Sequence, residues 1–271
     1  MTEGELWSRG LLAELRAASY KPPAWISFLS RAFARAREIR KQRRREHRET
    51  LALAAAGLLA WVIVAAAGQP WVALAGATWW LLVTLMIDWH LGMLEDASGR
   101  PIEGLGLANM LSILRAGVVP ALLVASPTVL VGLLIAAGAT DVLDGRVARA
   151  RGEQTRLGHW LDGSVDGLIL GAAAIGAART DLLAWWVVAL VLGRHALQWL
   201  AVAAVFFIHA QAPPRKRLVS ARKPGIVLFA GLALVGLHVA GAAVLVVAGA
   251  LGGLSTLAMS IARSYPAGAA S

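Results

Sequence analysis

The chain alternates long apolar runs with short polar connections, and this pattern predicts its secondary structure. A helix that crosses the hydrocarbon core of a bilayer needs about 20 apolar residues. In lipid every backbone amide must be hydrogen-bonded within its own segment, so runs of this length predict helices. We predict eight membrane spans, at residues 51–68, 71–90, 107–126, 128–147, 159–178, 182–208, 224–238 and 241–262.

Composition agrees with a membrane protein. Hydrophobic residues make up 58% of the 271 residues and charged residues only 15%, whereas soluble domains carry about 25% charged residues. We therefore predict an all-α integral membrane protein. The chain contains no cysteine, which excludes a disulfide framework and a thiolate nucleophile or metal ligand. The first 50 residues are polar and basic, unlike a cleavable signal peptide.

Three segments differ in composition. Residues 1–50 form a basic extension in which apolar residues recur at helical spacing from Pro22 onward. This pattern predicts an amphipathic helix on an anionic membrane surface, although a solvated basic tail would also fit it. Residues 51–106 hold two spans and a polar, turn-rich linker, and residues 107–271 hold the other six spans. We predict a basic extension, a two-helix hairpin and a six-helix transmembrane domain.

The distribution of positive charge predicts the topology. Residues 1–50 hold 12 of the 26 lysines and arginines, and residues 209–224 hold another five. The short connections on the opposite side hold a single basic residue, Arg179. By the positive-inside rule, both termini and the basic loops face the cytoplasm in a multi-pass cell membrane protein. A nucleic-acid partner for the run "RKQRRREHR" is not expected in such a protein.

Four aspartates interrupt the apolar pattern at the cytoplasmic ends of the fourth and fifth spans. Asp141 and Asp144 are three residues apart, and Asp162 and Asp166 are four apart, so each pair lies on one helix face. A short connection makes the two helices antiparallel neighbours, and the acids can converge on one cavity. Close carboxylates require cations. Oxygen ligands favour Mg²⁺, Mn²⁺ or Ca²⁺, and Mg²⁺ leaves positions for substrate phosphates.

The residues between the acids suit a ligand that approaches the backbone. Gly145 and Ala148 leave the helix face beside the acids bare, and Gly158 lies just before the fifth span. Arg149 could bind a phosphate through two hydrogen bonds, or it could be an arginine that only fixes topology.

The pattern Asp141-x2-Asp144-Gly145-x2-Ala148-Arg149-x8-Gly158-x3-Asp162-x3-Asp166 resembles the signature of the CDP-alcohol phosphotransferase family. The segment "NMLSILR", from Asn109 to Arg115, resembles the opening of that family's first core helix, and residues 107–262 resemble its six-helix core. Residues 1–106 have no counterpart in that core.

The resemblance implies transfer of a phosphate-linked group from a CDP-activated lipid, such as CDP-diacylglycerol, to a hydroxyl acceptor, with release of CMP. It implies two metal ions, Mg²⁺ or Mn²⁺, bound by Asp141, Asp144, Asp162 and Asp166, with Asp166 also acting as the general base. It places Gly145, Ala148, Arg149, Gly158, Asn109 and Arg115 at the CDP site. The partners would be a CDP-linked lipid donor, the acceptor, membrane lipids and a second copy in a homodimer.

The acceptor site is less clearly marked. Arg194 lies within the sixth span, where an intramembrane charge indicates function. Ser220, Arg222 and Lys223 precede the seventh span. These residues resemble basic positions of members that use glycerophosphate, although "ARKPG" departs from the local pattern of those members. We expect a phosphorylated polyol such as glycerol 3-phosphate, while snorkelling and topology would explain the same arginines and lysine.

Two other functions would use the same acids. A cation transporter also places carboxylates in the membrane, but near the midplane and beside broken helices. A non-catalytic family member would not require all four acids. The sequence therefore favours the enzyme.

Overall fold

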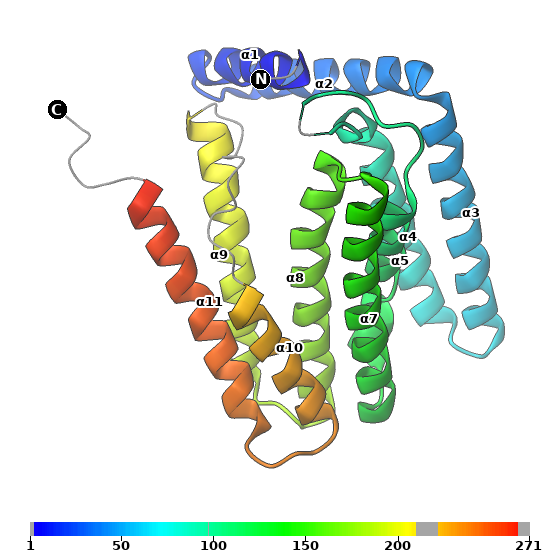
Figure 1. Cartoon of the computed structure of the whole chain (residues 1–271), viewed down its shortest axis with the longest axis vertical. Coiled ribbons are helices and arrows are strands. Elements are labelled where there is room, and N and C mark those ends of the chain that lie inside the picture. Colours follow the sequence, from blue (N-terminus) through cyan, green and yellow to red (C-terminus); the bar gives the residue numbers. More distant parts are fainter. Residues whose placement is uncertain (1–2, 97, 210–221, 265–271) are drawn as a thin grey trace. The chain divides into compact units, whose positions relative to one another are not determined.

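The computed structural model describes residues 3–96, 98–209 and 222–264, and this part of the chain is almost entirely helical. No β-strand is present in the described residues, apart from one isolated bridge between Glu95 and Pro101. The helices are α1 (Glu3–Ala17), α2 (Pro22–Gln42), α3 (Arg44–Ala66), α4 (Pro70–Trp89), η1 (Leu91–Met93), α5 (Leu107–Gly117), α6 (Val119–Val124), α7 (Pro127–Arg151), α8 (Arg156–Arg179), α9 (Trp185–His209), α10 (Arg222–Gly236) and α11 (Ala242–Ser264) (Figure 1).

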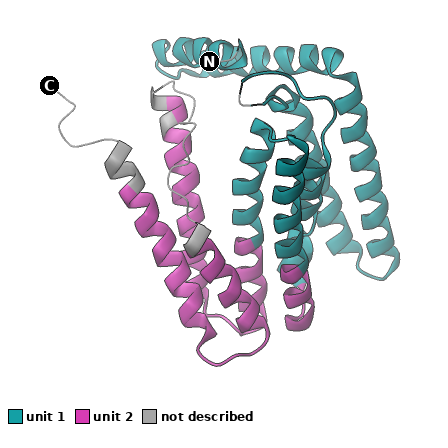
Figure 2. Cartoon of the chain, in the orientation of Figure 1, with its two compact units in different colours: residues 1–124, 136–169 teal, residues 125–135, 170–271 magenta. Residues whose placement is uncertain are grey.

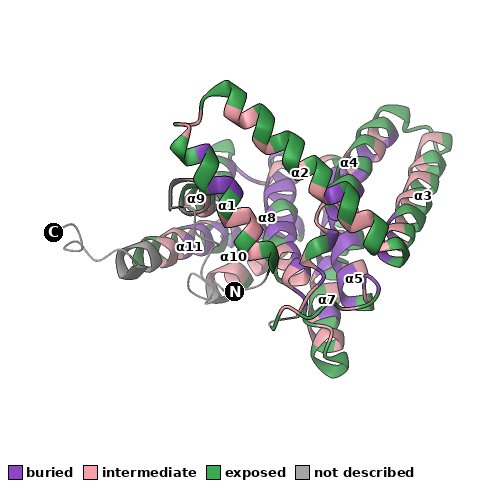
Figure 3. Cartoon of the chain, turned by 90° about the horizontal axis from the view of Figure 1, so that it is seen from above, coloured by how far each residue is buried: buried purple, intermediate pink, exposed green. Residues whose placement is uncertain are grey.

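All eight predicted spans are helical, and the predicted all-α membrane fold is confirmed. Seven helical segments among the described residues are long and apolar enough to cross a membrane. The predicted span 224–238 corresponds to α10, whose apolar part, Pro224–Gly236, is shorter than the seven candidate spans. Figure 3 shows many buried residues along α8, and most of its apolar stretch is buried.

The third predicted span is divided into α5 and α6 by a proline. Pro120 has no N–H to donate to the carbonyl of Ala116 four residues earlier. The indole N–H of Trp79 in α4 donates to this carbonyl instead, at 2.8 Å. The carbonyl of Ala116 therefore keeps a hydrogen-bond donor despite the break, and this bond connects α4 to the end of α5.

The chain divides into two compact units (Figure 2). The first unit comprises residues 1–124 and 136–169, and the second comprises residues 125–135 and 170–271. All four signature aspartates, together with Asn109 and Arg115, lie in the first unit.

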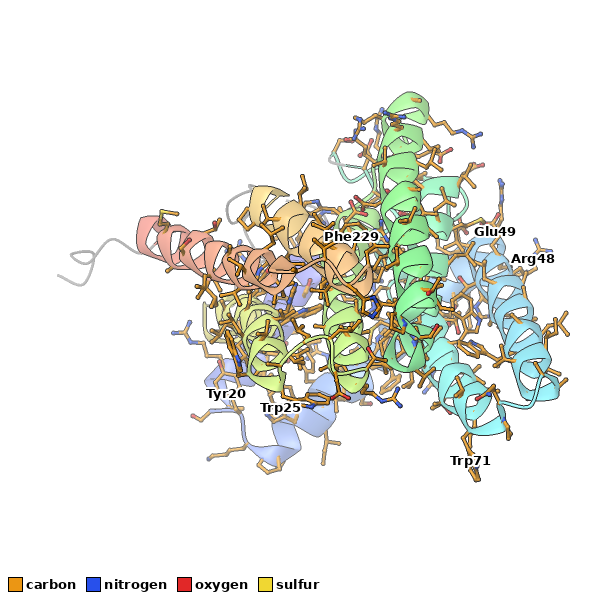
Figure 4. The ribbon with its side chains drawn as sticks, turned by 90° about the horizontal axis from the view of Figure 1, so that it is seen from below. Tyr20, Trp25, Arg48, Glu49, Trp71 and Phe229 are labelled. Atoms are coloured by element: carbon orange, nitrogen blue, oxygen red, sulfur yellow. The ribbon has the colours of Figure 1, made fainter. Side chains whose placement is uncertain are left out.

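Helices α3 and α4 form the predicted hairpin, and two glycine–tryptophan pairs hold them together. A Cβ atom at Gly57 of α3 would lie within 2.1 Å of the indole of Trp80 in α4, and one at Gly76 of α4 within 2.5 Å of the indole of Trp61 in α3. Each glycine therefore provides the space that the opposite tryptophan fills. Near the connection between the two helices, Trp71 projects outward and is 81% exposed (Figure 4).

Helices α1 and α2 pack against each other and run across the direction of α3 (Figure 1). Leu11, Leu12 and Leu15 of α1 are buried. Helix α2 begins with two prolines, which suit the first helical turn. The predicted helix from Pro22 is confirmed, and its binding to a membrane surface stays a prediction. Helix α1 was not predicted.

A polar cluster joins α2 and α3 to the end of α4. The carboxylate of Asp88 forms an ion pair with Nε of Arg40 and lies beside Nδ1 of His47, each at 2.6 Å. The side chain of Asp88 is only 12% exposed. An acid at the end of a membrane span is commonly exposed to solvent. Asp88 is instead the common partner of two basic side chains from different helices.

The linker between α4 and α5 has little regular structure and is fixed by side chains. Asp96 accepts hydrogen bonds from the hydroxyl and N–H of Ser98 and from the N–H of Arg100. These hydrogen bonds hold the pKa of Asp96 well below its ordinary value, and the bond from the Ser98 hydroxyl contributes most. The carboxylate that closes this turn is therefore charged at neutral pH.

In the second unit, α10 and α11 approach each other through glycines. A Cβ at Gly249 would lie 2.5 Å from the backbone nitrogen of Leu228, and one at Gly231 would lie 2.8 Å from that of Val246. Small residues at such crossings allow the close backbone contact on which membrane helices depend.

Candidate active site

One arginine and four carboxylates form the centre of the candidate site. The guanidinium of Arg115 in α5 lies 2.5 Å from Asp141 and 3.6 Å from Asp144, both of α7. It also lies 3.9 Å from Asp162 and 3.5 Å from Asp166, both of α8. The structure thus brings the two predicted acid pairs together around a single side chain, as their helical spacing requires.

These five side chains differ in their exposure. The side chain of Arg115 is 1% exposed and that of Asp144 is 5% exposed, whereas those of Asp141, Asp162 and Asp166 are between 41% and 53% exposed. The hydroxyl of Ser112 donates to Asp144 at 2.9 Å, one turn before Arg115 on α5. Arg115 and Asp144 are therefore buried, whereas the other three acids remain accessible to solvent.

The acids were predicted to bind metal ions. In the described part of the chain, no group of three or more histidine, aspartate or glutamate side chains is arranged to hold a metal ion. The guanidinium lies among the acids as their counter-charge. However, all four acids lie within 4 Å of this one cation, and their oxygens are of the type that hard divalent ions prefer. The donor set therefore fits Mg²⁺ or Mn²⁺ chemically.

Arg115 also retains unused hydrogen-bonding capacity. Its Nη1 donates to Asp141, while its buried Nε and Nη2 have no hydrogen-bond partner among the described residues. A buried donor without a partner carries a desolvation penalty. The guanidinium is therefore held among the four acids mainly by charge.

A second group of residues lies at the start of α8. The hydroxyl of Thr155 accepts the N–H of Gly158 at 2.9 Å, which is the hydrogen bond of a helix N-cap. The side-chain amide of Asn109 donates to this hydroxyl at 3.1 Å and to the carbonyl of Leu105 at 2.7 Å. Thr155 therefore links two residues that the sequence predicted separately, Asn109 and Gly158.

Gly158 is required by this arrangement. A Cβ at position 158 would lie 2.5 Å from Oδ1 of Asn109, a distance at which the buried amide would have to move. The glycine therefore permits the first turn of α8 to lie directly against α5.

The remaining predicted CDP-site residues lie on α7. Arg149 is exposed, and its Nη1 lies 3.3 Å from where a Cβ on Gly145 would be. Ala148 accepts the N–H of Glu153 through its carbonyl at 3.0 Å. Helix α7 ends at Arg151, and the following Gly152 has a positive φ of 65°, which favours glycine. The guanidinium of Arg149 thus lies against the helix face that Gly145 leaves without a side chain.

The model of the family described as CDP-alcohol phosphatidyltransferase matches residues 105–261. The match covers more than half of the chain and includes every acid of the site. This chain belongs to the CDP-alcohol phosphatidyltransferase family.

Curated relatives have similar stretches within this family. A Drosophila melanogaster protein named "Probable cardiolipin synthase (CMP-forming)" is 34% identical over 115 residues, which are 41% of this chain and 35% of that protein. A Mycobacterium tuberculosis protein named "Probable phosphatidylglycerophosphate synthase" is 34% identical over 99 residues, 33% of this chain and 47% of that protein. The chain spans about half the length, or less, of the curated relatives it matches. No solved structure matches it.

The residues predicted for the acceptor site are less completely described. Arg194 of α9 is 5% exposed, and its guanidinium lies against Gly253 of α11, where a Cβ would be 2.0 Å from Nε. Its Nη1 is buried without a hydrogen-bond partner in the described residues. Ser220 and the side chains of Arg222 and Lys223 lie outside the described residues.

Sequence reasoning missed three residues that the structure places beside the site. Ser112 binds Asp144, Thr155 caps α8, and Arg156 forms ion pairs with acids far away in sequence. Only Thr155 had a local signal, because a threonine directly before a helix is a common N-cap.

Proposed function

We propose that this protein transfers a phosphatidyl group from a CDP-activated lipid, such as CDP-diacylglycerol, to a hydroxyl acceptor and releases CMP, in phospholipid biosynthesis. The observation that carries the proposal is the convergence of Asp141, Asp144, Asp162 and Asp166 on one buried cation, Arg115. Membership of the CDP-alcohol phosphatidyltransferase family supports it.

The reaction would depend on a divalent metal, Mg²⁺ or Mn²⁺, with two ions held by the four aspartates. When bound, such ions would neutralise the charge that grows on the departing CMP. Buried Asp144, fixed by Ser112, would provide the rigid part of this site, and half-exposed Asp141 and Asp162 the accessible part.

Asp166 is the acid that we assign as general base. Its side chain is 53% exposed, the largest value among the four, so an acceptor hydroxyl can reach it. A base must come within hydrogen-bond distance of the proton that it removes. Asp166 would take this proton as the acceptor oxygen bonds to the phosphorus and the bond from phosphorus to CMP breaks.

The donor nucleotide would lie between α5, α7 and the first turn of α8. Asn109 and Gly158 form the close contact at one end of this region, and on α7 the region is bordered by Gly145, Ala148 and exposed Arg149. Arg149 can pair with a phosphate through two hydrogen bonds. Arg115 would act on the donor indirectly, through the acids that it holds.

The acceptor would carry a glycerol hydroxyl and a phosphate. The two relatives are named for the products cardiolipin and phosphatidylglycerophosphate, and both of these lipids contain glycerol joined to phosphate. Buried Arg194, which has an unpaired nitrogen, would bind the anionic part of the acceptor. Ser220, Arg222 and Lys223 would serve the same anion.

The site would face the cytoplasm, on the side of the basic loops and both termini. The donor has a lipid half in the bilayer and a nucleotide half in water, which suits a site at that interface. We extend to this chain the expectation of a homodimer, which cross-linking of the purified protein can test.

One assay tests the activity and the acceptor together. Purified protein is incubated with CDP-diacylglycerol, MgCl₂ and one acceptor at a time: glycerol 3-phosphate, phosphatidylglycerol, inositol phosphate, inositol or serine. We expect CMP with one of the first two acceptors and none after chelation of divalent metal. If none of the acceptors leads to release of CMP, the proposal is contradicted. Cation flux in proteoliposomes would then favour a transporter.

A further inference from the structure

Arg156, the first residue of α8, joins three segments that are far apart in sequence. Its Nη1 lies 2.6 Å from Glu95 in the linker, and its Nη2 pairs with Glu5 of α1. Its backbone N–H also donates to the carbonyl of Glu95 at 3.1 Å. The side chains of Arg156, Glu5 and Glu95 are 27%, 11% and 14% exposed, so these ion pairs are mostly shielded from solvent.

The linker that carries Glu95 is itself fixed by Arg43, which directly precedes α3, and by the first turns of α3. Arg43 donates to the carbonyls of Leu94 and Ile102, at 3.0 and 2.7 Å. Glu46 and Glu49 accept the N–H groups of Gly104 and Leu105, at 3.0 and 2.7 Å. Glu95 is therefore attached to a rigid part of the N-terminal region and not to a free loop.

A ring contact supports the same attachment one turn further along α8. Trp160 stacks on His90, which lies at the end of α4, with ring centroids 5.5 Å apart and planes 21° apart. The first turn of α8 is thus held at Arg156 by charge and at Trp160 by an aromatic contact, in both cases by residues before position 107.

The opposite face of this turn contacts the candidate donor site. Thr155 precedes Arg156 directly, and its hydroxyl binds both Gly158 and Asn109. A shift at Arg156 would therefore change the spacing between α8 and α5, where the donor nucleotide would lie.

We infer that Arg156, together with Glu5 and Glu95, is a positioning residue that sets the donor-nucleotide site by fixing the first turn of α8. The N-terminal extension and linker, which lie outside the family match at residues 105–261, are then part of the donor-binding apparatus. This inference rests on the proposed function, since it assigns the donor to that site.

The test compares Arg156→Gln with Arg151→Gln in the full chain. Arg151 lies in the same connection and is exposed, and its ion pair with Glu153 is long, at 3.9 Å. Misplacement of a binding group reduces its effect steeply with distance. We expect Arg156→Gln to raise the KM for CDP-diacylglycerol on the order of tenfold, with little change in kcat or in the KM for the acceptor.

Further variants separate positioning from general stability. Glu95→Gln should raise the donor KM in the same direction, Arg156→Lys should recover part of the loss, and Arg151→Gln should match the wild type. The inference is overturned if Arg156→Gln leaves the donor KM unchanged, or if it lowers kcat in step with a lower melting temperature and leaves KM alone.

Calorimetric titration of CDP into each protein with MgCl₂ provides a readout that does not require turnover. Weaker CDP binding by Arg156→Gln than by Arg151→Gln supports the inference. If the wild type binds CDP but releases no CMP with any acceptor, the proposed function fails and the titration still decides the inference. Equal CDP affinities of the two variants, or no binding by the wild type, would overturn it.

Discussion

The guanidinium of Arg115 lies 2.5 Å from the carboxylate of Asp141, and together they connect α5 to α7. This pair belongs to a cluster in which one arginine is the shared counter-charge of four acids. Without divalent metal, Arg115→Met should therefore leave the acids to repel one another. We expect a loss of about 3 kcal/mol, the low end for breaking a buried ion pair, because three of the acids are partly exposed. Thermal unfolding in detergent measures the change.

Added MgCl₂ should restore stability to Arg115→Met more than it raises that of the wild type, because the ions would replace the missing charge. Arg146→Met is the matched control, since Arg146 is an exposed arginine on the same helix as Asp141. A wild-type melting temperature for Arg115→Met in the presence of a chelator would show that the arginine does not neutralise the acids.

Asp166→Asn should abolish catalysis and spare donor binding. The amide keeps the size of the side chain but cannot take a proton, and loss of a general base reduces turnover by about 10²–10⁴-fold. CMP release with the identified acceptor measures turnover, and titration with CDP measures binding. Asp181→Asn, an exposed acid beyond the end of α8, should behave as the wild type. Unchanged turnover in Asp166→Asn would remove the assignment of the base.

Thr155→Val should weaken the start of α8, because valine cannot accept the N–H of Gly158 or bind Asn109. Loss of an N-cap costs about 1 kcal/mol, and the buried amide of Asn109 would lose a partner as well. We expect a lower melting temperature and a higher KM for the CDP donor. Thr155→Ser keeps the hydroxyl and should retain most of both properties. If Val and Ser behave alike, the hydroxyl is not the link between α5 and α8.

Gly76→Ala should destabilise the α3–α4 hairpin, because the added methyl group would overlap the indole of Trp61. Such overpacking costs about 1–3 kcal/mol. Gly132→Ala is the control, since a Cβ there meets nothing within 4 Å. The melting temperature should fall only for Gly76→Ala, while CMP release per folded molecule stays unchanged. Equal melting temperatures for the two variants would contradict the packing seen in the hairpin.

The sequence was sufficient for the membrane helices and for the acid pairs, because both depend on local spacing. The pattern of Asp141, Asp144, Asp162 and Asp166 determines which helix faces carry the acids, and the helices then bring them together. The two predicted helices of the hairpin and the helix from Pro22 followed from the same kind of signal.

The residues that escaped prediction depend on contacts between distant segments. The sequence did not single out Arg156, because nothing near it in sequence shows that Glu5 and Glu95 will contact it. The assignment of Arg115 to the nucleotide site stays a prediction, and its contacts with the four acids become visible only when α5 lies beside α7 and α8. The short helix α1 is too weakly apolar for a span, and its leucines become buried only in the folded chain.

The cluster around Arg115 also restricts the order in which the protein can be assembled. Helix α5 precedes α7 and α8 in the chain, and until those two helices lie beside it its arginine is a charge without a partner in hydrocarbon, which is expensive. The acids that neutralise it arrive some 26 to 51 residues later, with Asp141 and then Asp166. The stable insertion of α5 therefore depends on α7 and α8, because these two helices carry the carboxylates that neutralise its buried arginine.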